Sequence, residues 1–412
     1  MRFGLIGERL GHSYSKEIHE RLGEYAYELI ELASPELGRF MERADFDGIN
    51  VTIPYKRAVI PYLDAIDESA EHIGAVNTVV KRYGKLIGYN TDFAGMRSLI
   101  AHAGIEVAGK DALILGTGGT SRTAQAVLES MGAKRIDKVS RRYGEGVLTY
   151  EQALTERPGT QIIVNATPVG MYPNSDASPI DISAFPQLEG VIDAIYNPLR
   201  TNMVLDAQRK GARACGGLYM LVAQAIHASA IFLDRKADES EIGRIYRELV
   251  SEKRNIVLIG MPSSGKSLIG GMLAQRLGKE LFDTDELIME RTGKAPSELI
   301  GRLGENGFRD IEGEIVIETA SAAGKIIATG GGSILREANV RALARNGILV
   351  YLDKSLENLV ATEDRPLSSD QGALDALYEQ RTPIYERIAD VRIDANTQPE
   401  DIETTIMEEL KL

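Results

Sequence analysis

Residues 260–267 read GMPSSGKS, and this motif constrains the fold more than any other stretch of the chain. It follows the apolar run IVLIG and precedes SLIGGMLAQRLG, which has the spacing of a helix. A G-x-x-x-x-G-K-S pattern between a strand and a helix wraps backbone N–H groups around phosphate oxygens. The motif therefore predicts an α/β domain with a phosphate-binding loop, in which Lys266 contacts the terminal phosphates and Ser267 binds Mg²⁺.

The chain has 412 residues and a formal net charge of −13. This length predicts two or three domains. The acidic balance argues against nucleic acids and anionic membranes as partners, because both attract basic surfaces. The lone Cys215 allows no intramolecular disulfide, and the His spacing suggests no metal site. No apolar stretch is long enough to span a bilayer. We therefore expect a cytoplasmic protein with small-molecule ligands.

Short apolar runs alternate with segments of helical spacing along the whole chain, which indicates α/β architecture. In the middle of the chain, ALIL, IDKVS, IIVNAT and GVIDAI are spaced so that crossover helices fit between them, as a parallel sheet requires. Residues 234–254 are rich in charge and carry one apolar helical stripe. We expect this helix to run into a linker at 251–254, with a second α/β domain over 255–412.

GTGGTS at 116–121 follows ALIL and precedes a helix, which is the setting of a dinucleotide-binding turn. Ser121 stands where a third glycine is usual, and a similar turn also occurs in other α/β domains. Asp137 lies near the start of the next strand, whereas Ser140 and Arg141 lie at its end, where the ribose is read. An arginine there favours NADP over NAD, although it can also be a solvated loop residue.

Candidate catalytic groups lie in GHSYS, NVTIPYK, GAVNT and NTDFAG. Lys56 and Asp92 form a plausible acid–base pair, because reduction of a ketone leaves an alkoxide that needs a proton from a nearby donor. Ser13 and Ser15 are spaced to contact one carboxylate. A Lys–Asp pair inferred from sequence alone can also be purely structural.

This set of motifs resembles the shikimate dehydrogenase family, from GLIGERLGHSYS to GGLYMLVAQA. The resemblance implies a substrate domain of residues 1–98 and 218–250 and a Rossmann NADP-binding domain of residues 99–217. It implies that Lys56 and Asp92 are catalytic. Substrate contacts are implied for Ser13, Ser15, Thr52, Asn77, Asp92, Tyr196 and Gln224. Contacts to NADP(H) are implied for Gly116, Gly118, Gly119, Thr120, Ser121, Ser140, Arg141, Ala194 and Gly217, with Tyr196 beside the cofactor.

The C-terminal part adds LFDTD, GFRD, TGGGS, DRPL and R-x-P-x-Y in that order. Two carboxylates two residues apart, at the end of a strand, can serve a metal and a substrate hydroxyl. With the phosphate loop, this series resembles the shikimate kinase family. The resemblance implies a P-loop kinase fold and Mg²⁺ at Ser267 and Asp283. ATP contacts are implied for Ser263, Ser264, Gly265, Lys266, Ser267, Leu268 and Arg365. Substrate contacts are implied for Asp285, Arg309, Gly331 and Arg381, with Asp285 catalytic.

Together the two resemblances imply a bifunctional enzyme, because the product of one activity is the substrate of the other. Such an enzyme reduces 3-dehydroshikimate with NADPH and then phosphorylates shikimate with ATP and Mg²⁺, as a monomer or a homodimer. One alternative is an active dehydrogenase fused to a degenerate, regulatory nucleotide-binding module. The short lid segment around Thr362 favours this alternative. Another is an NAD-linked quinate/shikimate dehydrogenase joined to a different small-molecule kinase.

Overall fold

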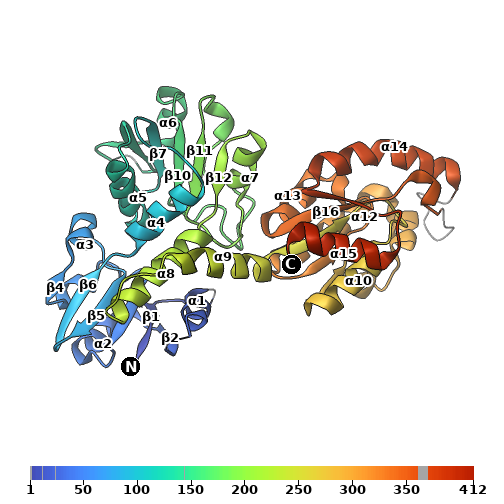
Figure 1. Ribbon diagram of the computed structural model, residues 1–412. Helices are drawn as coiled ribbons and strands as arrows, with labels where there is room; N and C mark the ends of the chain where they lie inside the picture. The colour runs from blue at the N-terminus through green and yellow to red at the C-terminus, as the bar shows by residue number, and fades with distance from the viewer. Residues whose placement is uncertain (1, 12, 24, 143, 361–369) are drawn as a thin grey trace. The chain divides into compact units, whose positions relative to one another are not determined.

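A computed structural model describes residues 2–11, 13–23, 25–142, 144–360 and 370–412. Its contacts divide the chain into two compact units, Met1–Glu248 and Leu249–Leu412. The first unit contains two six-stranded sheets and the second contains one five-stranded sheet. The ribbon is shown in Figure 1. The α/β class predicted from the sequence is confirmed in both units.

The first sheet of unit 1 has the strand order β2-β1-β3-β5-β6-β4. It is mixed, because β3 pairs antiparallel with β5 and β5 pairs antiparallel with β6. Tyr83 and Gly84 join β5 to β6, and both have positive φ, as a tight two-residue hairpin requires. The strands are β1 (Phe3–Gly7), β2 (Tyr27–Glu31), β3 (Gly48–Val51), β4 (Ala65–Ile66), β5 (Thr78–Arg82) and β6 (Lys85–Tyr89).

Short helices connect these strands, and a longer helix from later in the chain packs among them. That helix, α8 (Leu218–Phe232), contacts α4, α1 and β5. Phe232 stacks on Phe3 of β1 with ring centroids 4.9 Å apart, so residues far apart in sequence share one core. The connecting helices are α1 (Ser15–Arg21), η1 (Ser34–Glu36), α2 (Leu37–Arg43), η2 (Ile60–Tyr62), α3 (Glu68–Ile73) and α4 (Asp92–His102).

The second sheet of unit 1 is parallel, with the order β12-β11-β10-β7-β8-β9. If these six strands are renumbered 1 to 6 in chain order, from β7 to β12, the order read from the β9 edge is 3-2-1-4-5-6. This is the strand order of the dinucleotide-binding Rossmann fold. Alternate residues of β7 face opposite layers: Ile114 packs with α4 and α5, and Leu113 packs with α6 and α7. The elements are β7 (Asp111–Leu115), α5 (Gly119–Ser130), β8 (Arg135–Val139), β9 (Val147–Leu148), α6 (Tyr150–Glu156), β10 (Ile162–Asn165), η3 (Ile182–Ala184), β11 (Gly190–Asp193), α7 (Asn202–Arg209) and β12 (Arg213–Cys215).

Helix α9 (Ser240–Lys253) spans the division between the two units. Ile242, Ile245 and Leu249 form its buried stripe, as the apolar spacing indicates. Residues 251–253, which the sequence analysis assigns to a linker, are the last turn of this helix. Arg254 alone separates α9 from the first strand of unit 2.

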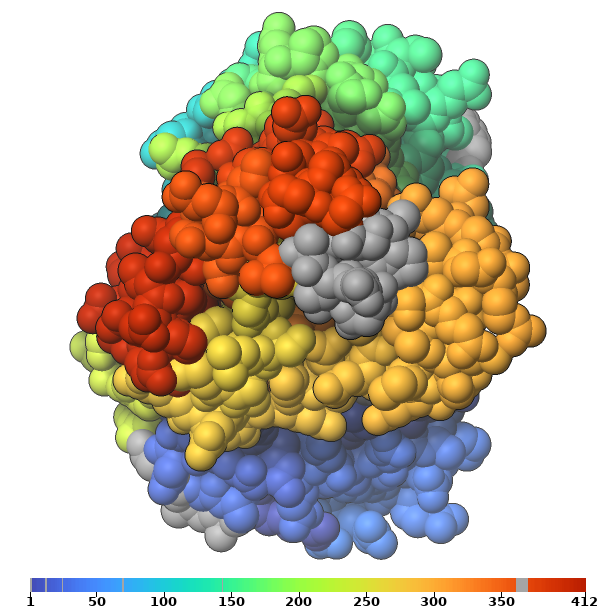
Figure 2. All heavy atoms as spheres, turned by 90° about the vertical axis from the view of Figure 1, so that its right-hand side faces the viewer, coloured from blue at the N-terminus to red at the C-terminus, as the bar shows by residue number. Residues whose placement is uncertain are grey.

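The sheet of unit 2 is parallel, with the order β14-β15-β13-β16-β17. Helices α10 and α15 cover one face, and α13 and α14 lie on the other (Figure 1). The contact between α10 and α15 is also visible at the surface in Figure 2. The elements are β13 (Asn255–Ile259), α10 (Lys266–Leu277), β14 (Leu281–Asp283), α11 (Thr284–Thr292), α12 (Pro296–Ser321), β15 (Ile326–Ala328), η4 (Ser333–Leu335), α13 (Glu337–Asn346), β16 (Gly347–Asp353), η5 (Leu356–Asn358), α14 (Gln371–Ile388), β17 (Val391–Asp394) and α15 (Pro399–Leu410).

Candidate active sites

Lys56 and Asp92, predicted from the sequence as a pair, are in direct contact. The Lys56 ammonium donates to the Asp92 carboxylate at 2.5 Å, and their side chains are 21% and 10% exposed. Lys56 lies in the turn that follows β3, where its carbonyl accepts the Val76 N–H. Asp92 is the first residue of α4. The Asp92 carboxylate therefore balances the charge of the Lys56 ammonium, and both side chains remain partly exposed to solvent. A group that transfers a proton to a bound substrate needs such access.

A buried hydrogen-bond network joins Thr91, the residue before Asp92, to α8. The Thr91 N–H donates to Asn77 Oδ1 at 2.7 Å, and Asn77 Nδ2 donates to Thr91 Oγ1 at 3.0 Å. Thr91 Oγ1 also lies 3.4 Å from Gln224 Oε1. Asn77 and Gln224, both predicted to contact substrate, are thus brought together. Thr91 was not predicted, although it stands beside Asp92 in the NTD motif.

The N-terminal serines lie at the start of α1. The Ser15 N–H donates to Ser13 Oγ at 3.3 Å, and Ser15 is buried. Between them, the Tyr14 ring lies 5.3 Å from the ring of Tyr196. Burial, and then the neighbouring Tyr14, raise the pKa of Tyr196 to about 12, so its hydroxyl stays protonated near neutral pH. Thr52 directly follows β3 and donates its N–H to the Ile6 carbonyl at 3.0 Å.

The GTGGTS turn joins β7 to α5, as the sequence predicts. Gly116 has φ +105°, and a Cβ there would lie 3.1 Å from the Ala166 carbonyl oxygen, so glycine is required. A Cβ at Gly118 or Gly119 would meet no atom within 4 Å, which leaves open space at the helix start. The first N–H groups of α5 can therefore face an anion such as a pyrophosphate.

The end of β8 carries the residues predicted to read the ribose. Asp137 lies within the strand and accepts a 2.6 Å hydrogen bond from Arg157, so its carboxylate already has a partner. The strand ends at Val139. Ser140 Oγ accepts the N–H of Arg142 at 3.3 Å, and Arg141 is exposed. A cationic side chain free to meet a phosphate thus stands where the sequence analysis expects it.

Ala194 and Gly217 form a close backbone contact. The Gly217 N–H donates to the Ile195 carbonyl at 2.7 Å, and a Cβ at Gly217 would lie 2.3 Å from the Ala194 carbonyl oxygen. Before them, the buried Asp193 carboxylate accepts from Thr201 at 2.7 Å and from the Ile195 N–H at 3.0 Å. Burial raises the pKa of Asp193 to about 6. Asp193 was not predicted, and it positions the turn that carries Ala194 and Tyr196.

In unit 2 the phosphate loop follows the central strand β13. Positive φ angles at Gly260, Ser263 and Gly265 curl the backbone before α10 begins at Lys266. The buried Lys266 ammonium donates to the carbonyls of Gly260 at 3.0 Å and Met261 at 2.8 Å. Ser264 is buried, Leu268 is exposed, and Ser263 Oγ donates to the Val360 carbonyl at 3.0 Å. Arg365 and Thr362 lie outside the described residues.

Asp283 and Asp285 stand on either side of the junction between β14 and α11. Ser267 Oγ donates to Asp283 Oδ2 at 2.5 Å, and Asp283 Oδ1 accepts the Asp285 N–H at 3.0 Å. Ser267 and Asp283 present adjacent oxygen ligands of the kind that Mg²⁺ takes alongside water and phosphate. Among the described residues no cluster of three or more Asp, Glu, His or Cys could hold a metal alone.

A cavity of about 570 Å³ opens beside the phosphate loop. Arg309 and Arg381 are both buried against it, and burial lowers the pKa of Arg381. Arg309 donates to the buried Glu312 at 2.7 Å. Two guanidinium groups in one cavity suit an anionic ligand. The cavity brings together every described residue predicted for the acceptor and the metal: Ser267, Asp283, Asp285, Arg309, Gly331 and Arg381.

The TGGGS loop packs tightly between the phosphate loop and α12. A Cβ at Gly332 would lie 1.9 Å from Arg309 Nη2, and one at Gly331 would lie 2.9 Å from Pro262 Cδ. Its position depends on Tyr385, whose hydroxyl contacts the Gly331 carbonyl at 2.5 Å. The sequence analysis noted Tyr385 only as part of R-x-P-x-Y and assigned it no role.

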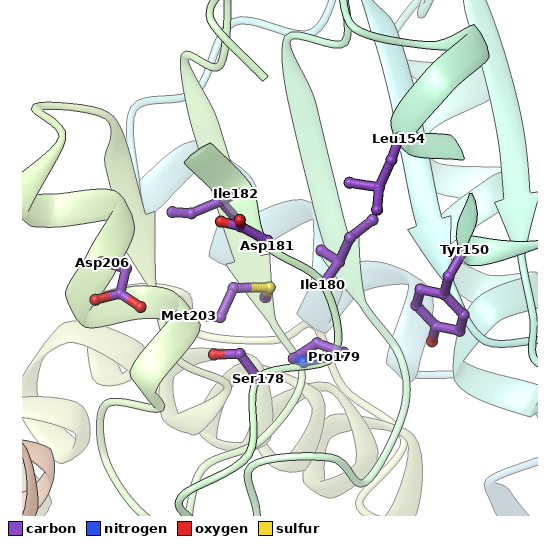
Figure 3. A pocket seen from close by; sticks show the side chains of 9 residues that line it. All are labelled: Tyr150, Leu154, Ser178, Pro179, Ile180, Asp181, Ile182, Met203 and Asp206. Carbon is purple, nitrogen blue, oxygen red and sulfur yellow. The ribbon is translucent and has the colours of Figure 1, made fainter. Parts of the chain in front are cut away.

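A second cavity, of about 490 Å³, lies in the Rossmann part of unit 1 (Figure 3). Tyr150 and Leu154 of α6 line one side, Met203 and Asp206 of α7 line the other, and residues 178–182 lie between them. None of the residues predicted for a site lines this cavity.

No described helix is long and apolar enough to cross a membrane.

Known proteins match unit 1, and family models match both units. A shikimate dehydrogenase from Clostridium beijerinckii, named as NADP(+)-dependent, is 37% identical over 261 residues, which cover 59% of this chain and 96% of the relative. The chain belongs to the shikimate dehydrogenase family. The family model for its substrate-binding domain matches residues 5–79. The shikimate kinase model matches residues 262–411.

Solved structures agree with the dehydrogenase family over unit 1. Shikimate dehydrogenase 1 from Peptoclostridium difficile is 39% identical with a TM-score of 0.56, and the match covers 60% of this chain and 98% of that one. A chorismate mutase/shikimate 5-dehydrogenase fusion protein from Clostridium acetobutylicum is 35% identical with a TM-score of 0.57, covering 60% and 96%. That solved protein carries a shikimate 5-dehydrogenase fused to another enzyme.

Proposed function

We propose that the chain catalyses two successive reactions. Unit 1 reduces 3-dehydroshikimate to shikimate with NADPH, and unit 2 phosphorylates shikimate to shikimate 3-phosphate with ATP and Mg²⁺. The observation that carries this proposal is the presence of both family matches in one chain, each over a unit with its own candidate active site. Domain limits of 1–98 with 218–250, 99–217 and 255–412 accompany the proposal, as does a cytoplasmic location.

In unit 1, Gly116–Ser121 would hold NADPH, which when bound would supply the hydride that reduces the substrate ketone. The Lys56 ammonium donates a proton to the oxygen that becomes a hydroxyl, and Asp92 holds that ammonium in place at 2.5 Å. The amides of Asn77 and Gln224 orient the ring hydroxyls. Ser13 and Ser15 bind the substrate carboxylate, while Thr52 and Tyr196 complete the substrate contacts. The Lys56–Asp92 contact, the hydrogen bonds of Thr91 to Asn77 and Gln224, and the Tyr14–Tyr196 ring contact support these roles.

Ser140, Arg141, Ala194 and Gly217 are proposed to complete the cofactor site with Thr120 and Ser121. Arg141 is exposed at the end of β8, so its guanidinium can pair with the 2′-phosphate of NADP(H). The nearest acid in that strand, Asp137, is paired with Arg157 and cannot serve as the ribose acceptor that NAD needs. This argues for NADP(H) over NAD(H).

In unit 2, Asp285 accepts the proton of the attacking shikimate hydroxyl, and Lys266 neutralises charge on the transferred phosphoryl group. Arg309 and Arg381 pair with the shikimate carboxylate, and Gly331 packs against the ring. Ser267 Oγ and Asp283 fit Mg²⁺, which supplies charge neutralisation at the phosphates when bound. Ser263–Leu268 hold the nucleotide, and Arg365, outside the described residues, is proposed to contact ATP.

The kinase activity is tested without the dehydrogenase. Purified protein receives shikimate and Mg²⁺-ATP with no NADP(H), and ADP and shikimate 3-phosphate are measured. We expect both to form in equal amounts, with Lys266→Ala as the inactive control. ATP binding with no shikimate-dependent ADP would instead mean that unit 2 is a degenerate regulatory module. A parallel assay with shikimate and either NADP⁺ or NAD⁺ tests the reductase and its cofactor.

A further inference from the structure

The hydroxyl of Tyr385 lies between the two loops that form the proposed kinase site. It is 2.5 Å from the Gly331 carbonyl oxygen of the TGGGS loop and 2.9 Å from the Gly260 carbonyl oxygen of the phosphate loop. Tyr385 is completely buried in α14, and its ring stacks on Tyr351 of β16 at 5.1 Å. The ring is therefore held in place, and only the hydroxyl hydrogen is free to turn.

A tyrosine hydroxyl has one hydrogen to donate, so it can serve only one of these two carbonyls at a time. Burial raises the pKa of Tyr385, so the hydroxyl remains a donor at any physiological pH. In this structure Lys266 also donates to the Gly260 carbonyl, at 3.0 Å. The Gly260 carbonyl thus already has a donor, and the shorter contact of Tyr385 is to Gly331.

Nucleotide binding changes this balance. In a phosphate loop the lysine moves its ammonium to the terminal phosphates, and here that removes the donor that Gly260 has from Lys266. A buried carbonyl left without a donor costs on the order of 1–3 kcal/mol. Tyr385 can restore the bond by turning its hydrogen to Gly260, and the Gly331 carbonyl then loses its donor. Gly331 lines the cavity, so its released carbonyl can accept a hydrogen bond from a hydroxyl of the substrate that is to be phosphorylated.

We propose that Tyr385 is a positioning residue that couples the phosphate loop to the acceptor side of the cavity by switching its hydroxyl between Gly331 and Gly260. This inference rests on the proposed kinase function of unit 2. It adds that nucleotide and shikimate each strengthen the binding of the other, since coupling between two sites is reciprocal. Arg381, a proposed carboxylate ligand, lies four residues before Tyr385 in α14 and therefore on the same side of that helix.

The coupling is measured by titrating ADP with Mg²⁺ into the full-length protein, with and without saturating shikimate. NADPH is present throughout, so that the dinucleotide site of unit 1 is filled without oxidation of shikimate and only unit 2 takes up ADP. For the wild type we expect shikimate to lower the Kd for ADP about fivefold or more, the lower end of common coupling strengths. For Tyr385→Phe, which keeps the ring, we expect the ratio of the two Kd values to fall to within about twofold of one.

Tyr351→Phe is the matched control, because it removes a hydroxyl from the other ring of the stack. That hydroxyl contacts Asp353 at 3.0 Å and neither loop carbonyl, so its variant should keep the wild-type ratio. A wild-type ratio near one, or an unchanged ratio in Tyr385→Phe, would overturn the switch. If shikimate is still phosphorylated in either case, the proposed function stands without it.

A second measurement needs no variant at Tyr385. Amide hydrogen exchange of the Thr329–Leu335 segment is followed in the wild type with and without ADP and Mg²⁺. The switch predicts faster exchange on adding nucleotide, because the TGGGS loop loses its bond to α14. Bound ligands usually slow exchange, so an unchanged or slower rate would contradict the switch, even if Tyr385→Phe fails to fold.

Discussion

The Lys56 ammonium and the Asp92 carboxylate are 2.5 Å apart, joining the turn after β3 to the first residue of α4. They are separated by 36 positions in sequence, and the antiparallel β5–β6 hairpin between them brings α4 back to β3. Hence the pair depends on the fold of the first sheet as well as on the two side chains.

Lys56→Ala should lower the dehydrogenase turnover by about two orders of magnitude or more, because it removes the proton donor. Kinase turnover should not change, since Lys56 lies in unit 1. Steady-state rates of both reactions check this. Lys16→Ala is the control, because Lys16 is exposed and forms only a surface ion pair with Glu20. A near wild-type reductase rate in Lys56→Ala would refute the assignment.

Arg141→Ala should weaken NADPH binding by roughly tenfold or more and leave NADH binding almost unchanged, as loss of a charge-assisted contact to one phosphate predicts. Fluorescence titration with each cofactor measures the two affinities. Arg135→Ala removes an arginine from the other end of the same strand and should affect neither cofactor. Equal losses for NADPH and NADH in Arg141→Ala would point to a structural role.

Asp285→Asn should reduce phosphoryl transfer by about two orders of magnitude while ATP affinity stays within a few-fold of wild type, because the shape is kept and the proton acceptor is lost. Lys266→Ala should weaken nucleotide binding directly. Kinase rates and nucleotide Kd values distinguish these effects. Should Asp285→Asn lose as much ATP affinity as Lys266→Ala, Asp283 and Asp285 would have to exchange their assigned roles.

The last turn of α9 should be needed for the stability of unit 2. Lys279 Nζ donates to the carbonyls of Ser251, Glu252 and Arg254, and the Gly324 N–H donates to Lys253. A fragment 255–412 lacks all four of these acceptor carbonyls, so it should be less stable than 249–412 by on the order of 2–4 kcal/mol. Denaturant unfolding compares the two.

Lys279→Ala in the 249–412 fragment should reproduce most of that loss. Equal stability of 249–412 and 255–412 would show that the helix end contributes nothing. The complementary fragment 1–248 should keep dehydrogenase activity, because both of its sheets and α8 lie inside it.

Local sequence patterns predicted much of both sites. The phosphate loop, the GTGGTS turn and the parallel strands could be predicted because each is set by residues close together in the chain. The strand end at Val139 placed Arg141 correctly relative to β8. The Lys56–Asp92 contact was also predicted, with its motifs as the signal.

Other features depend on contacts between distant segments and left no local signal. The antiparallel β3–β5 pairing comes from long-range packing, and the expected linker at 251–253 is helical because Lys279, far along the chain, caps that helix end. Thr91, Asp193 and Tyr385 act through hydrogen bonds to remote groups. The residue type alone does not indicate such a role, since threonine, aspartate and tyrosine have many others.

The most direct test supplies the full-length protein with 3-dehydroshikimate, NADPH and Mg²⁺-ATP together and follows all products over time. The account predicts shikimate 3-phosphate, with one NADPH oxidised and one ADP formed for each molecule. Omitting ATP should stop the reaction at shikimate. Shikimate that accumulates while ATP remains unused would contradict the account, because unit 2 would then bind a nucleotide without acting as a shikimate kinase.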